Sequence, residues 1–161
     1  IKDYAHMLKS DPAYADKAAR VVSLAMDITE YLASIEMPAP KLRTGLSVAY
    51  HSACSLQHGQ KVTKAPKDLL AKAGFVVREP MEGHLCCGSA GTYNILQSEI
   101  ADRLKERKVK NIERTGAAVV AAGNIGCMTQ IGSGTALPVV HTVELLDWAW
   151  GGPRPPRLLA E

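Results

Sequence analysis

Residues 117–122 read Ala-Ala-Val-Val-Ala-Ala, an uninterrupted apolar run that directly follows Gly116. A run of this length without polar residues predicts a strand that is buried on both faces. Strands of that kind belong to parallel sheets, because the crossover helices of a parallel sheet cover both of its faces. This segment therefore predicts an interior strand of a parallel α/β sheet.

The segments on either side alternate between strand and helix patterns. Short apolar runs predict three more strands, over 46–50, 75–77 and 138–140. Apolar residues at helical spacing predict helices over 65–73, 92–114 and 143–150. Because strands and helices follow one another in this order, we expect an α/β fold, a short parallel sheet of about four strands flanked by helices.

Helical patterns alone precede this region. The sequence predicts a short helix over 2–9 and a longer one from Pro12 to about Glu36, which a Pro-rich linker over 37–40 then ends. Since the first residue is not Met, we interpret the chain as a piece of a longer protein. We expect three parts: an N-terminal helical segment over 1–37, a cysteine-rich α/β domain over 42–150, and a disordered tail over 151–161, rich in Gly, Pro and Arg and dispensable for folding.

The composition excludes several classes of protein. The chain of 161 residues suffices for one domain with a hydrophobic core. A net charge of +3 and an aromatic content of 5% argue against nucleic acid as a partner. No apolar run is long enough to span a membrane, and the first residues lack a secretion signal. We therefore expect a cytoplasmic protein whose thiols stay reduced.

The four cysteines each follow a predicted strand. Cys54 comes after the first strand, Cys86 and Cys87 lie in the loop after the second, and Cys127 lies in the loop after the third. The carboxyl ends of parallel strands share one edge of the sheet, where ligands bind. The sequence therefore predicts that the four thiols converge in a single crevice.

Four converging thiols have three interpretations: small buried side chains, disulfides, or the ligands of a metal or an iron–sulfur cluster. Thiolates are soft ligands that select zinc or iron–sulfur clusters, and the spacing alone leaves both open. Two glycines, Gly83 and Gly88, are expected to give the loop between them positive φ angles. Three histidines also fall at predicted strand ends, where packing roles are more common than ligation: His51, His84 and His141.

The cysteine spacing resembles the CCG family of cysteine-rich domains. Between Cys54 and the pair Cys86-Cys87 lie 31 residues, and 39 more separate that pair from Cys127. The strings HLCCGSAGTY over 84–93 and NIGCMTQI over 124–131 are most similar to the second CCG module of glycolate oxidase (glycolate dehydrogenase) iron–sulfur subunits.

This resemblance implies a function in electron transfer. It implies a cluster-binding module in the iron–sulfur subunit of a flavin-linked dehydrogenase of glycolate or another 2-hydroxy acid, with no catalysis by this segment alone. The partners implied are flavin-containing subunits and the rest of the same subunit, with the membrane reached only peripherally, at the inner membrane, through the complex. The implied cofactor is an iron–sulfur cluster of the 4Fe-4S type, and its implied ligands are Cys54, Cys86, Cys87 and Cys127.

One position departs from the family pattern. Gln130 stands where the pattern ends in the second cysteine of C-x2-C. An amide oxygen is a poor substitute for thiolate, which leaves a simpler cluster, zinc or a site without metal open. The alternative functions are a metal-free or zinc-stabilised docking module for flavin subunits, and a CCG subunit of a lactate, glycerol-3-phosphate or heterodisulfide redox enzyme.

Overall fold

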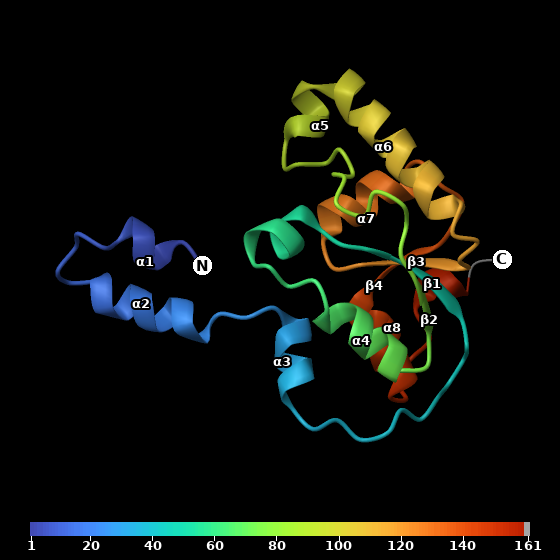
Figure 1. Cartoon of the computed structure of the whole chain (residues 1–161), viewed down its shortest axis with the longest axis horizontal. Helices are drawn as coiled ribbons and strands as arrows, with labels where there is room; N and C mark the ends of the chain where they lie inside the picture. Colours follow the sequence, from blue (N-terminus) through green and yellow to red (C-terminus); the bar gives the residue numbers. More distant parts are fainter. Residues whose placement is uncertain (160–161) are drawn as a thin grey trace.

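A computed structural model describes residues 1–159 of the chain (Figure 1). Its centre is a four-stranded, fully parallel sheet in the order β2-β1-β3-β4. The strands are β1 (Ser47–His51), β2 (Val76–Arg78), β3 (Val119–Ala122) and β4 (Val139–His141). The prediction of a short parallel sheet flanked by helices, with helices at the N-terminus, is confirmed.

The strand order creates a switch point in the sheet. From β1 the chain moves outward to β2 on one side, and then returns to place β3 on the other side of β1. Across this junction His51, the last residue of β1, pairs with Ala122, the last residue of β3. In open α/β sheets such a junction leaves a crevice at the carboxyl ends of the strands, where ligands bind.

Helices cover the sheet on both faces, which gives three layers (Figure 1). One face packs against α4 (Ala65–Lys72) and α8 (Thr142–Ala149), and the other against α6 (Ser98–Glu113) and α7 (Ile125–Gly132). The residues of β3 are fully buried, as the opening apolar run predicts. Side chains alternate along each strand, so β1 gives Val48 and Tyr50 to the first face and Ala49 to the second.

Helix α7 corrects the prediction that Cys127 lies in a loop. Asn124 caps this helix, its Oδ1 accepting from the backbone N–H of Cys127 at 3.1 Å. The two glycines within α7 lower its intrinsic helix propensity. Burial of Cys127, Gln130 and Ile131 along one side of α7 outweighs that loss, because packing supplies most of the stability of a helix in a protein.

Two of the long predicted helices are broken. The N-terminal one divides into α2 (Ala15–Leu24) and α3 (Ile28–Ser34), because Asp27 and Glu30 form a capping box that starts a new helix. The helix predicted over 92–114 divides into α5 (Tyr93–Leu96) and α6 at the non-helical residue Gln97. Among the helices of residues 1–159, none combines the length and the apolar character needed to cross a membrane.

The two ends of the chain differ in how they meet the body. Helix α2 packs against the short helix α1 (Tyr4–Met7), and the pair projects away from the sheet (Figure 1). At the other end, Pro155 is buried, Leu158 packs against the core, and the Arg154 guanidinium lies 5.8 Å from the ring centre of Trp148. The limits expected for the helical segment, the domain and the tail stay predictions.

Candidate metal centre

All four cysteines line one pocket of about 380 Å³ at the carboxyl edge of the sheet. Cys54 follows β1 and precedes a π-helical turn, η1 (Ser55–Gly59), while Cys86 and Cys87 follow β2. Cys127 lies in the first turn of α7, directly after β3. All are free thiols, and Cys87 and Cys127 are buried. The predicted convergence of the thiols is therefore confirmed.

A fully buried lysine holds the loop that carries the cysteine pair. Lys108 is 1% exposed, and its Nζ donates to the carbonyl oxygens of Glu82 at 3.0 Å and of Gly83 at 3.2 Å. The Glu82 carboxylate in turn accepts from Arg107 Nε and from Asn111 Nδ2, each at 2.8 Å. Helix α6 thereby fixes the loop just before Cys86 and Cys87.

Glycine is required where this loop passes α6. Gly88 has φ +91°, and a Cβ added there would lie 2.3 Å from the carbonyl oxygen of Ala101. Its backbone N–H donates to the sulfur of Cys86 at 3.3 Å. The positive φ expected at Gly88 is confirmed, but the one expected at Gly83 is wrong. The loop turns at Glu82 instead, with φ +53°.

A second close approach joins the loop to α7. A Cβ added to Gly126 would lie 2.8 Å from the hydroxyl oxygen of Ser89. Gly126 directly precedes Cys127, and Ser89 follows the cysteine pair by two residues. The small residues around the cysteines thus let two segments, distant in sequence, bring their thiols together.

Of the histidines, His51 lies beside the thiols. It is 2% exposed, and one of its ring nitrogens and the sulfurs of Cys87 and Cys127 all lie within 4.8 Å of one another. Neither ring nitrogen has a hydrogen-bond partner among residues 1–159. His58 and His84 are exposed. Nε2 of His58 lies 3.3 Å from the backbone oxygen of His84.

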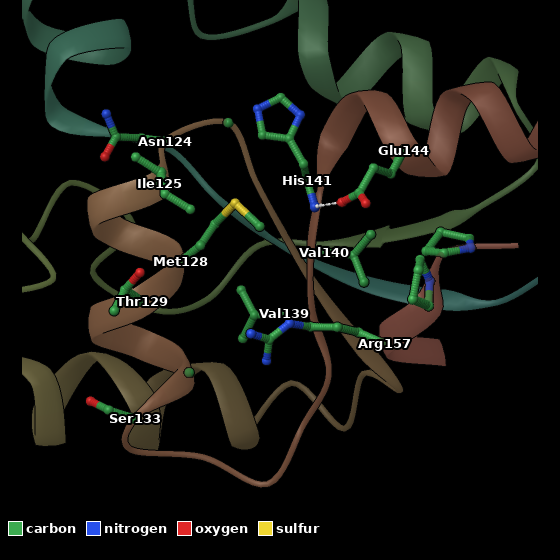
Figure 2. Close-up of a pocket in the computed structure, with 14 residues that line it drawn as sticks. Asn124, Ile125, Met128, Thr129, Ser133, Val139, Val140, His141, Glu144 and Arg157 are labelled. Atoms are coloured by element: carbon green, nitrogen blue, oxygen red, sulfur yellow. Dashed lines mark hydrogen bonds between the residues drawn. The ribbon is translucent and has the colours of Figure 1, made fainter. Parts of the chain in front are cut away.

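His141 serves a structural purpose. It lines a larger cleft of about 930 Å³ between α7 and β4 (Figure 2). Its Nδ1 accepts from the backbone N–H of Val143, and its own backbone N–H donates to the Glu144 carboxylate at 2.9 Å (Figure 2). These bonds form the capping box of α8. Since no cysteine lines this cleft, the smaller pocket is the candidate site.

The thiols perturb one another electrostatically. The Cys127 thiol, which can donate to the neighbouring sulfur, lowers the pKa of Cys87 to about 4, and His51 acts in the same direction. The same contact raises the pKa of Cys127. Burial, followed by the adjacent Cys86, raises the pKa of Cys54 to about 11. At neutral pH the group therefore favours one thiolate, and ionising all four requires a cation.

The donor set fits a metal ion or an iron–sulfur cluster. Four thiols in one pocket supply the soft ligands that both require. Burial lowers the pKa of the nearby Lys108, while Cys54, Cys87 and Cys86 act on it in the opposite direction. Gln130 takes no part, since it lies outside the pocket lining and its Oε1 accepts from Asn94 Nδ2 at 3.2 Å.

A parallel α/β sheet with four thiols at its switch point defines a cysteine-rich domain built to hold a metal centre. The family profile described as "CCG: Cysteine-rich domain" matches residues 48–132. The chain belongs to this family.

The curated relatives are longer proteins. The chain is 36% identical to the glycolate oxidase iron-sulfur subunit of Escherichia coli (strain K12) over 149 residues, which are 92% of this chain and 37% of that protein. It is 27% identical to lactate utilization protein A of Halalkalibacterium halodurans, over 90% of this chain and 62% of that protein. It is 29% identical to a probable glycolate oxidase iron-sulfur subunit of Bacillus subtilis (strain 168), over 94% and 36%. The chain thus spans less than two thirds of each.

Lys108 was not among the residues predicted for the site, and His51 was predicted to have a packing role. A signal for Lys108 was present, since it lies four residues before Ile112 and seven after Ala101, on the buried face of α6. For His51 the signal was weaker. Strand β1 ends one residue later than predicted, which makes His51 part of the alternating strand pattern.

Proposed function

We propose that this chain is the cluster-binding, electron-transfer module of the iron–sulfur subunit of a flavin-linked dehydrogenase that acts on glycolate or a related 2-hydroxy acid. The observation that carries the proposal is the gathering of four thiols in one pocket. The relatives named as glycolate oxidase iron-sulfur subunits support the substrate class.

In this proposal the ligands are Cys54, Cys86, Cys87 and Cys127, and the group they hold is a 4Fe-4S cluster. Such a cluster, when bound, accepts and releases electrons one at a time. The chain's own contribution is to position the thiols and to keep water from the buried pair, Cys87 and Cys127. The pocket is open enough for Cys54 and Cys86 to remain partly exposed, which leaves a short path to a partner.

The partners proposed are flavin-containing subunits, which would oxidise the substrate, and the rest of the same iron–sulfur subunit. We place the complex in the cytoplasm, with peripheral contact to the inner membrane. We expect the chain alone not to oxidise glycolate, because in this proposal the flavin-containing subunits carry out the oxidation and the thiol pocket supplies ligands.

Anaerobic purification with elemental analysis tests the proposal. Iron and sulfide should copurify with the chain or enter it on reconstitution, giving the visible absorption of thiolate-bound iron. Cys127→Ser should abolish that absorption, because the substitution removes a buried ligand. Met128→Leu is the matched control, since it replaces the neighbouring sulfur on α7, which faces the larger cleft, and should leave iron binding unchanged (Figure 2).

The competing function is a zinc-stabilised docking module. The observation that favours it is the His51, Cys87 and Cys127 group, whose residue types also suit a single zinc ion. Tight, stoichiometric zinc with no iron uptake under anaerobic conditions would replace our proposal with this one. Equal iron uptake by the wild type and Cys127→Ser would also contradict the proposed ligand set.

A further inference from the structure

His51 is placed by the strand register rather than by a loop. It pairs with Ala122 across the junction of β1 and β3, where the order of strand addition reverses. Side chains alternate along a strand, so His51 points to the same face as Ala49. Ala49 belongs to the core cluster that contains Cys87 and Cys127. The imidazole therefore enters the side of the sheet that holds the buried thiols.

The imidazole is buried without hydrogen bonds. At 2% exposure it is shielded from bulk solvent, and neither Nδ1 nor Nε2 has a partner within the described part of the chain. Burying a polar group without a hydrogen-bond partner is destabilising. An imidazole in this state is able to bond a metal through a ring nitrogen.

The spacing matches shared coordination. One ring nitrogen and the sulfurs of Cys87 and Cys127 lie within 4.8 Å of one another. Metal–nitrogen bonds measure about 2.0–2.1 Å and metal–sulfur bonds about 2.3 Å, so tetrahedral ligands of one ion lie about 3.5–4 Å apart. Movements of about 1 Å would bring the three atoms to that distance.

Gln130 carries a buried amide on α7, and this amide already has a hydrogen-bond partner. Gln130 lies one turn beyond Cys127, but its Oε1 already accepts from Asn94 Nδ2 at 3.2 Å. His51, by contrast, has no partner for either ring nitrogen among the described residues, and one of these nitrogens lies within 4.8 Å of the sulfurs of Cys87 and Cys127.

We propose that His51 is a direct ligand of the metal centre, bonding one metal through a ring nitrogen beside Cys87 and Cys127. This inference rests on the proposed function, because it concerns the metal centre that Cys87 and Cys127 would help to hold. As a ligand additional to the four proposed cysteines, a neutral imidazole adds no negative charge to the centre, whereas a fifth thiolate would add one and lower the reduction potential. His51 thereby gives the centre a mixed nitrogen and sulfur ligand set.

Pulsed electron paramagnetic resonance on the reconstituted wild-type chain tests this assignment. The chain is labelled with heavy-isotope histidine and measured in the paramagnetic redox state. We expect the strong nitrogen coupling of a metal-bonded imidazole. The coupling should disappear in His51→Ala and persist in His58→Ala, which removes an exposed histidine on η1. His51→Cys should restore full iron content with a lower reduction potential.

The outcomes separate this inference from the proposed function. If the wild type takes up no iron and sulfide, the proposed function itself fails. If the wild type is loaded but shows no strong histidine coupling, or if His51→Ala keeps the wild-type spectrum and potential, only the His51 assignment is overturned. The labelling experiment needs no variant, so a folding defect in His51→Ala cannot obscure the result, and circular dichroism checks that variant.

Discussion

Single residues decide whether the cysteine loop reaches its place beside the sheet. Because Gly88 has no side chain, the loop can contact the backbone of α6. Lys108 donates to the backbone carbonyl oxygen of Glu82 at the start of the loop, and the Glu82 carboxylate accepts from Arg107 and Asn111. Each of these contacts involves atoms with little freedom to move, since α6 is a regular helix of 16 residues. Substitutions at Gly88, Lys108 or Glu82 should therefore disturb the loop that carries Cys86 and Cys87, and with it the thiol pocket.

We expect Gly88→Ala to lower the free energy of unfolding by about 3 kcal/mol or more, because it combines a left-handed conformation with a backbone clash at 2.3 Å. Gly116→Ala is the control. Gly116 also has a positive φ, but nothing lies within 4 Å of an added Cβ, so the loss should be about 1 kcal/mol. Urea unfolding measures both, and equal losses would show that the close approach at Gly88 is absent.

Lys108→Met should lower the free energy of unfolding by about 1–2 kcal/mol, because the carbonyl groups of Glu82 and Gly83 lose their donor. Methionine keeps most of the length of the side chain. Lys105→Met removes an ion pair with the exposed Asp102 on the same helix and should change stability by about 0.5 kcal/mol or less. Chemical denaturation measures the stability of both variants. If Lys108→Met is as stable as the wild type, the hydrogen bonds from Lys108 to Glu82 and Gly83 do not contribute to stability.

The Glu82 carboxylate makes stability depend on pH in a defined direction. Hydrogen bonds from Arg107 and then Asn111 hold the pKa of Glu82 at about 2, below the ordinary 4.5. Because the folded pKa is lowered, this contribution is present above pH 4.5 and is lost as the pH falls towards about 2. Thermal melts of wild type and Glu82→Gln should therefore converge on acidification. A difference that stays constant over this range would argue against the ion pair.

At the scale of elements, the helix caps place the site. Helix α7 begins at the carboxyl end of β3, and the Asn124 cap fixes the turn from which Cys127 enters the pocket. The break at Gln97 separates α5 from α6, and Ile95 and Leu96 of α5 are exposed at 76% and 73%. Start and stop signals thus matter more to this site than helix length.

Asn124→Ala should cost about 1 kcal/mol of stability, because the first turn of α7 loses its side-chain acceptor. Asn124→Ser should retain most of the stability, since serine is also a good N-cap. Thermal unfolding provides the comparison. The thiol of Cys127 should also react faster with an alkylating reagent in the alanine variant, and unchanged reactivity would show that the cap does not hold the cysteine.

At the scale of the whole molecule, the sheet and its helix layers form the body, and the N-terminal helices add to it unequally. Helix α3 packs on α4, and Leu32 reaches the core. Helices α1 and α2 pack on each other and leave large side chains such as Val21 and Leu24 exposed. The body should therefore fold without the first two helices.

Removal of residues 1–24 should lower the free energy of unfolding by about 1 kcal/mol or less, since Ala18 is the one buried residue of α2 and none of α1 is buried. Removal of residues 1–36 is the matched comparison. It also deletes Leu32 and the buried Thr29, and should cost about 2–3 kcal/mol more. Similar losses for the two truncations would show that α1 and α2 dock on the body.

The sheet and the convergence of the thiols follow from sequence patterns alone. The apolar run at 117–122 required burial on both faces, and the alternation of strands and helices required parallel pairing. Once the strands are parallel, residues that follow them must share one edge. The positions of Cys54, Cys86, Cys87 and Cys127 at one pocket follow from that geometry, whatever the details of the loops.

The roles of His51, Lys108 and α7 depend instead on contacts between distant segments. A one-residue shift in the end of β1 changes which face its last side chain joins, and local sequence does not fix strand ends that closely. A lysine on a helix is expected to be exposed from sequence alone, but here a loop places carbonyl groups beside the Lys108 ammonium group. The glycines of α7 favour a loop by local preference, but packing against the sheet buries one side of the segment and stabilises it as a helix. In each case the physical reason is the same, because contacts between segments distant in the chain outweigh local preference.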